Sequence, residues 1–164
     1  MTAQQQTEAC KCLVAVKVRG EVSAQREAKE TTEFLHLKHT NHAVIIDSRP
    51  AYLGMLHRAQ SYVTWGEATK ETIAMMLSKR GKLTGSKLIT EEAAQKLGYK
   101  TIEELAEAIA TCKVAFQDLE GVQKVFRLHP PKKGYKGKTK KSFNAGGEAG
   151  YRGEAINELV KRMV

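Results

Sequence analysis

The segment CLVAVKV, residues Cys12–Val18, carries valine at every second position and mostly apolar residues between. β-Branched side chains favour an extended backbone. Apolar residues at both odd-numbered and even-numbered positions indicate that both faces of the strand are buried. This segment is therefore expected to form a central strand, around which the neighbouring segments pack.

Helical and strand-like segments alternate after this strand. A helix is expected over Ser23–Leu37, with Ser23 as its N-cap, and a buried strand at the apolar run Ala43–Asp47. A second helix is expected to run to Tyr62 with Pro50 in its first turn, and Val63–Gly66 predicts a third strand. Right-handed crossovers between these strands would place both helices on one face of a three-stranded sheet.

The predicted fold class is α/β: a small ferredoxin-like β-α-β-α-β sandwich with an α-helical segment, a basic loop and a C-terminal helix. The apolar segment Val125–Leu128 is the later segment expected to add a strand, and an apolar stripe from Ile156 to Met163 predicts the closing helix. We expect a flexible N-terminus over 1–11 and an α/β domain over 12–67. A helical extension over 68–164 is expected to contain the basic loop at about 130–150.

The basic loop lies in a run of positive charge between Glu120 and Glu148, where no acidic residue occurs. Six lysines fall between Lys132 and Lys141, in a chain whose net charge is +9. Proline and glycine are expected to interrupt any helix or strand over residues 130–153. Because like charges repel, the loop is not expected to be well ordered without a polyanion, and nucleic-acid phosphate is the favoured counterpart.

Two aromatic residues lie among the lysines. Tyr135 and Phe143 are expected to stack on exposed RNA bases. A solvated tail is the competing interpretation, but an amphipathic helix follows the loop and would hold its far end. An acidic protein is an alternative partner, which would make the chain a protein-interaction module.

Other classes of function find little support. No apolar run approaches the length of a membrane span, and the polar N-terminus lacks the centre of a signal peptide. Cys10 and Cys12 form a CxC pair, but the odd number of cysteines suits a reducing cytoplasm rather than a disulfide framework. His36, His39 and His42 span a helix end, a turn and a strand start, so their rings are not expected to converge on a metal. The sequence predicts no enzyme, metal, cofactor, membrane or small-molecule substrate.

Several stretches resemble one known family in their order and spacing. The segments LHLKHTNHAV (Leu35–Val44), AYLGM (Ala51–Met55) and WGE (Trp65–Glu67) resemble large-subunit ribosomal protein L thirty. FRLHPP (Phe126–Pro131) and GGEAG (Gly146–Gly150) are similar to motifs of the longer archaeal and eukaryotic form, which eukaryotes call large-subunit protein seven. The histidine-proline-proline motif and the lack of a long basic N-terminal arm resemble the archaeal form.

This resemblance implies a structural constituent of the large ribosomal subunit that binds large-subunit ribosomal RNA in the cytoplasm and supports translation. Contact with the small ribosomal RNA of that subunit and with neighbouring ribosomal proteins is also implied, and no catalysis or cofactor is. A free RNA-binding or ribosome-assembly factor built on the same fold is the alternative.

The residues predicted to contact RNA combine the loop with basic side chains at strand ends, at helix ends and around the turn at 81–87. They are Arg19, Arg49, Arg58, Lys79, Arg80, Lys82, Lys87, Arg127, His129, Lys132, Lys133, Tyr135, Lys136, Lys138, Lys140, Lys141, Phe143 and Arg152.

Overall fold

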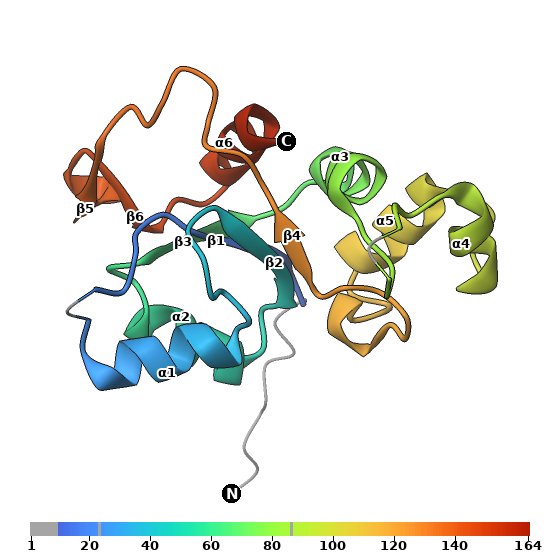
Figure 1. Cartoon of the computed structure of the whole chain (residues 1–164), viewed down its shortest axis with the longest axis horizontal. Coiled ribbons are helices and arrows are strands. Elements are labelled where there is room, and N and C mark those ends of the chain that lie inside the picture. Colours follow the sequence, from blue (N-terminus) through green and yellow to red (C-terminus); the bar gives the residue numbers. More distant parts are fainter. Residues whose placement is uncertain (1–9, 23, 86) are drawn as a thin grey trace, which may run out of the picture.

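A six-stranded sheet forms the centre of the computed structural model, which describes residues 10–22, 24–85 and 87–164 (Figure 1). The strand order across the sheet is β4-β2-β1-β3-β6-β5. The strands are β1 (Cys12–Lys17), β2 (His42–Asp47), β3 (Val63–Glu67), β4 (Val125–Arg127), β5 (Lys138–Ser142) and β6 (Gly147–Tyr151).

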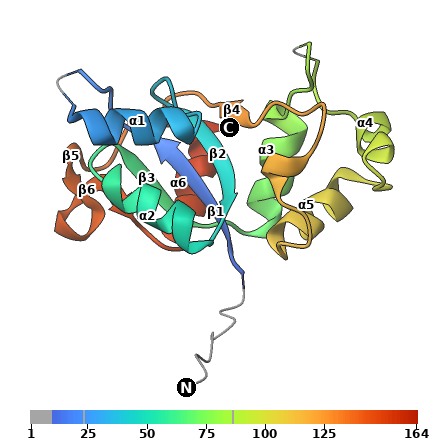
Figure 2. The same ribbon diagram turned by 90° about the horizontal axis from the view of Figure 1, so that it is seen from below.

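Helices cover both faces of the sheet (Figures 1 and 2). They are α1 (Arg26–Phe34), α2 (Pro50–Arg58), α3 (Lys70–Arg80), α4 (Glu91–Lys96), α5 (Ile102–Ala110) and α6 (Ala155–Met163), with short 3₁₀ turns at η1 (Phe116–Asp118) and η2 (Phe143–Ala145). No helix among the described residues has the length and apolar character needed to cross a lipid bilayer.

The predicted α/β fold class is confirmed, but the parallel crossover expected between the first two strands is wrong. β1 pairs antiparallel with both β2 and β3, so that Ala15 lies opposite Val44 on one side and Trp65 on the other. A strand with apolar residues on both faces is typical of a parallel sheet. Here the two faces are buried because different helices cover them, and strand direction does not follow from burial.

One face of the sheet packs against α1 and α2, as predicted. Leu13 and Ala15 of β1 share a buried cluster there with Leu35 and Leu56. The alternate residues of β1, Val14 and Val16, face a second cluster on the other side. That cluster contains Met76 of α3, Leu105 of α5 and Ile156 of α6. The helical extension therefore packs directly on the sheet, and the division at residue 67 stays a prediction.

The predicted strand at Val125–Leu128 is confirmed as β4, which pairs antiparallel with β2. The expectation that no strand forms over 130–153 is wrong, because β5 and β6 lie within it. β6 pairs in parallel with β3, and β5 pairs in parallel with β6 with an irregularity in the register. Glycine permits this packing: a Cβ atom added to Gly147 would lie 2.0 Å from the Lys141 carbonyl oxygen. The predicted N-cap Ser23 and residues 1–9 of the predicted flexible N-terminus lie outside the described residues.

Candidate nucleic-acid interface

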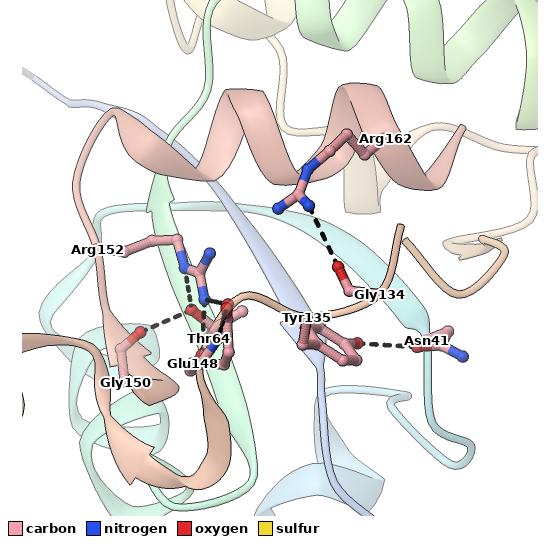
Figure 3. A network of polar contacts seen from close by, with 9 residues as sticks. Asn41, Thr64, Gly134, Tyr135, Glu148, Gly150, Arg152 and Arg162 are labelled. Atoms are coloured by element: carbon pink, nitrogen blue, oxygen red, sulfur yellow. Dashed lines mark hydrogen bonds and ion pairs between the residues drawn. The ribbon is translucent and has the colours of Figure 1, made fainter. Parts of the chain in front are cut away.

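The basic loop, residues 130–150, is held at its start by the end of α6. The N–H of His129 donates to the Met163 carbonyl at 2.9 Å, and the N–H of Lys132 donates to the Arg162 carbonyl at 3.0 Å. Arg162 in turn donates from Nη1 to the Gly134 carbonyl at 3.2 Å (Figure 3). The predicted closing helix therefore contacts the loop along its first five residues.

Tyr135 ties the middle of the loop to the body of the protein. Its hydroxyl donates to Asn41 Oδ1 at 3.0 Å (Figure 3), and its ring packs against the cluster below α6. Burial, followed by the nearby carboxylate of Glu148, raises the pKa of Tyr135 above its ordinary value. The side chain predicted to stack on RNA is thus half-buried and hydrogen-bonded inside the protein.

A buried polar network holds the far end of the loop. Arg152 donates from Nη2 to the Glu148 carboxylate and carbonyl, and from Nε to Thr64 Oγ1 at 2.8 Å (Figure 3). The N–H of Gly137 donates to the second carboxylate oxygen of Glu148 at 2.9 Å. Arg152, predicted to contact RNA, is therefore buried and engaged by β3 and by the loop itself.

The lysines of the loop point outward between these attachments. Lys136 forms an exposed ion pair with Glu158 of α6 at 2.9 Å. The others have no ion-pair partner within the described ranges and are exposed: Lys132, Lys133, Lys138, Lys140 and Lys141. Phe143 is partly exposed, and its ring lies under the Arg152 guanidinium, with the Cζ atom 4.8 Å from the ring centroid.

A second basic surface is a groove of about 410 Å³ beside β4. Its lining contains no acidic residue and consists of His36, Lys38, His39, His42, Gln123, Lys124, Val125 and Arg127. The register of β2 and β4 brings His42 opposite Arg127. The N–H of Gln123 donates to the Lys82 carbonyl at 2.8 Å, so the predicted residue Lys82 adjoins the groove.

A buried lysine that the sequence analysis missed supports this groove. Lys17 is 1% exposed, and its ammonium donates to the carbonyls of Leu37 and Lys38 at 2.8 and 3.2 Å and pairs with Glu21. It therefore fixes the chain that carries the groove histidines. The sequence signal was the placement of a lysine on an otherwise apolar strand, which usually requires a buried partner.

Two of the groove histidines lie side by side. The ring centroids of His39 and His42 are 5.1 Å apart in an edge-to-face arrangement. Burial, followed by the charges of His39, Arg127 and Lys17, lowers the pKa of His42 below its ordinary value. His42 Nδ1 is buried and has no hydrogen-bond partner in the part of the chain that the structure describes.

The remaining predicted residues lie outside the loop and the groove, and several contact other protein groups. Arg49 pairs with Asp47 at 3.1 Å just before α2, and Arg58 of α2 pairs with Glu27 of α1 at 3.3 Å. Arg19 lies over the Tyr62 ring, and Arg80 donates to the Val164 carbonyl. Lys79 and Lys87, near the turn after α3, are exposed.

Comparison with known proteins gives a consistent result. No family model matches the chain. It is 45% identical over 152 residues to large ribosomal subunit protein uL30 of Thermofilum pendens, which covers 92% of this chain and 97% of that protein. The uL30 proteins of Methanopyrus kandleri and Methanocorpusculum labreanum are 42% and 44% identical over 149 residues, covering 90% of this chain and 100% and 97% of theirs.

Proposed function

The chain belongs to the archaeal form of the large ribosomal subunit protein uL30 family, and from this premise we propose that it binds large-subunit ribosomal RNA through its basic loop and groove. Its role is structural: it holds RNA segments in a fixed relation within the large subunit, in the cytoplasm, and thereby supports translation. It carries out no catalytic step.

The observation that carries the proposal is the exposure of unpaired lysines on a loop that is attached at both ends. Lys138, Lys140 and Lys141 lie on β5 at the edge of the sheet, without an ion-pair partner in the described ranges. Edge-strand lysines also discourage pairing between sheets, but that purpose does not require Lys132 and Lys133 outside the strand. Phosphate neutralisation accounts for both groups, because each contact releases condensed counterions.

The groove extends the surface from the loop toward β4. Lys124 and Arg127 line the groove, and His129 lies between Arg127 and the loop along the chain. A groove lined by basic side chains with no acid suits an RNA backbone segment, and His42 offers a polar atom that has no hydrogen-bond partner among the described residues. Loop and groove together would contact RNA on two sides of β4, which favours one folded RNA region over scattered phosphates.

The identity of the RNA is a finer part of the proposal. Large-subunit ribosomal RNA is the principal partner, the small ribosomal RNA of that subunit is a second, and neighbouring ribosomal proteins contact the remaining surface. Sedimentation of the tagged chain with large subunits through a sucrose gradient at high salt tests this assignment. A ribosome-assembly factor would instead co-sediment with precursor particles and be missing from mature subunits, and that result would reject the proposal.

RNA contact by the loop is tested with matched charge variants. Replacement of Lys138, Lys140 and Lys141 by Gln should weaken binding to large-subunit RNA and reduce the log–log salt slope by about 2, at roughly 0.7 per lost phosphate contact. The control replaces three exposed lysines of the acidic helical segment and changes the net charge equally. Its residues are Lys96, Lys100 and Lys113. Equal effects of the two triple variants would refute a specific role for the loop.

A further inference from the structure

The three cysteines, which the sequence analysis left without a role, lie close together in the fold. Ligand atoms of Cys10, Asp47 and Cys112 all lie within 4.8 Å of one another. Cys12 lies next to this group, directly opposite Asp47 on the neighbouring strand, and its side chain is buried. None of these residues belongs to the basic loop or lines the groove, and the proposed function does not use them.

The pairing of β1 with β2 brings the first two ligands together. Cys12 lies directly opposite Asp47, so their side chains share one face of the sheet. Cys10 lies just before β1, with its sulfur within 4.8 Å of a carboxylate oxygen of Asp47. Two hydrogen bonds hold it there: the Lys11 N–H donates to Ser48 Oγ and the Ser48 N–H donates to the Lys11 carbonyl, both at 2.9 Å.

The end of α5 supplies the third ligand from a position about a hundred residues away. Cys112 has a positive φ of 53°, which is uncommon for a residue other than glycine. Its N–H donates to the Ile109 carbonyl at 3.0 Å, and the N–H of Lys113 donates to the Ala108 carbonyl at 2.9 Å. The left-handed turn reverses the chain at the helix end and presents the thiol to Cys10 and Asp47.

We propose that Cys10, Asp47 and Cys112 bind a thiophilic divalent cation, with Zn²⁺ as the ion of matching chemistry. Thiolate and carboxylate ligands are typical of Zn²⁺, at about 2.3 Å from sulfur and 2.0–2.2 Å from oxygen. Ligand atoms at those lengths around a tetrahedral ion are about 3.8 Å apart, so small side-chain rotations close the present spacing. Ca²⁺ and Mg²⁺ prefer all-oxygen sites and do not fit the two thiols.

Without a cation, the Asp47 carboxylate is paired with a guanidinium. Arg49 pairs with Asp47 at 3.1 Å, so a cation must compete with this guanidinium for the carboxylate. A thiol must lose its proton to coordinate a cation. Binding therefore releases protons, and the affinity increases with pH. The bound ion would join the chain before β1 to the end of α5, linking the sheet to the helical extension.

The test uses the full chain, kept reduced and stripped of metal with a chelator. Zn²⁺ is titrated against a chromophoric competitor, and Co²⁺ absorption reports thiolate coordination. We expect one equivalent per chain and a rise in melting temperature. Cys10→Ser and Cys112→Ser should each weaken binding more than about 100-fold, beyond the effect of residues that only support a ligand. Asp118→Asn, at an exposed acid, should leave binding unchanged.

Cys10 is exposed at the start of β1 and contributes little to the core, so Cys10→Ser is expected to fold even where Cys112→Ser does not. Binding of Zn²⁺ by a Cys10→Ser, Cys112→Ser double variant as strong as that of the parent would overturn the proposal. A Cys10–Cys112 disulfide that persists under reductant, with no metal taken up, would overturn it as well. Neither result bears on RNA binding, which is measured separately.

Discussion

Arg152 Nη2 lies 2.5 Å from Glu148 Oε2, and both side chains are about 95% buried, at 4% and 5% exposure. The pair joins the end of the basic loop to the start of α6, and Thr64 of β3 and the Gly137 N–H complete its hydrogen bonds. A buried ion pair costs desolvation energy and is stable only when its remaining polar atoms are satisfied. This pair meets that condition and so holds the loop against the sheet.

Removal of one member of the pair should therefore destabilise the protein strongly. Glu148→Ala leaves the Arg152 guanidinium buried without its counter-ion, and we expect a loss of about 3–5 kcal/mol in the free energy of unfolding. Urea denaturation followed by circular dichroism measures it. The matched control is Glu158→Ala, which breaks the exposed pair with Lys136 and should change stability little. Similar losses for both variants would contradict a special role for the buried pair.

The same carboxylate should make stability depend on pH. Burial alone would raise the pKa of Glu148, but hydrogen bonds from Arg152 and the Gly137 N–H outweigh it and hold the pKa below the ordinary 4.5. A depressed folded-state pKa contributes stability that is fully present above the ordinary value and is lost as pH falls through the folded value. The stability difference between the parent and Glu148→Gln should thus shrink between about pH 5 and pH 3. Urea titrations at several pH values check this, and a constant difference would count against it.

The close approach of β3 to the start of α6 predicts a strong effect of one methyl group. A Cβ atom on Gly66 would lie 1.9 Å from the Gly153 carbonyl oxygen, so the backbone must move. We expect Gly66→Ala to cost about 3 kcal/mol or more. Gly54→Ala is the control, because Gly54 lies within α2 with no atom within 4 Å of its added Cβ. That variant should be neutral or gain about 0.5–1 kcal/mol, and thermal melts rank the two.

The groove predicts a measurable shift in a histidine titration. The pKa of His42 is lowered first by burial and then by the positive charges of His39, Arg127 and Lys17. Arg127→Gln removes one of these charges and should raise the pKa of His42 toward its ordinary value, as followed by proton NMR of the imidazole. Lys132→Gln, on the loop, is the control variant and should leave the pKa of His42 unchanged. If Arg127→Gln had no effect on the titration, the two side chains would not be neighbours in solution.

The local signals in the sequence were sufficient for the first half of the fold. Apolar runs and helix starts located β1, α1, β2, α2 and β3, and Val125–Leu128 located β4. Strand direction was missed, because burial of both faces of β1 does not distinguish parallel from antiparallel neighbours. β6, GEAGY, was missed because its residues have low strand propensity. It forms a strand through its position between β3 and β5, where Gly147 lies too close to Lys141 for a side chain.

The candidate sites differ in how much of each could be predicted from the sequence. The exposed lysines of the loop follow from charge alone, since nothing in the nearby sequence neutralises them. Arg152 belongs to the same basic series but is buried, and only its tertiary contacts with Glu148 and Thr64 distinguish it from the lysines. The group formed by Cys10, Asp47 and Cys112 depends on a contact between the start of the chain and the end of α5. No local pattern encodes such a contact.

The strand order also determines when the sheet can be completed during synthesis. β2 and β3 flank β1, but their outer edges pair with β4 and β6, which end at Arg127 and Tyr151. A nascent chain that has emerged only to the end of β3 therefore has two open strand edges, each able to pair with another chain. The β3 edge stays unpaired longest, because more than eighty further residues must be synthesised before β6 is complete. The β2 and β3 edges can therefore pair wrongly with other chains during translation, until β4 and β6 cover them.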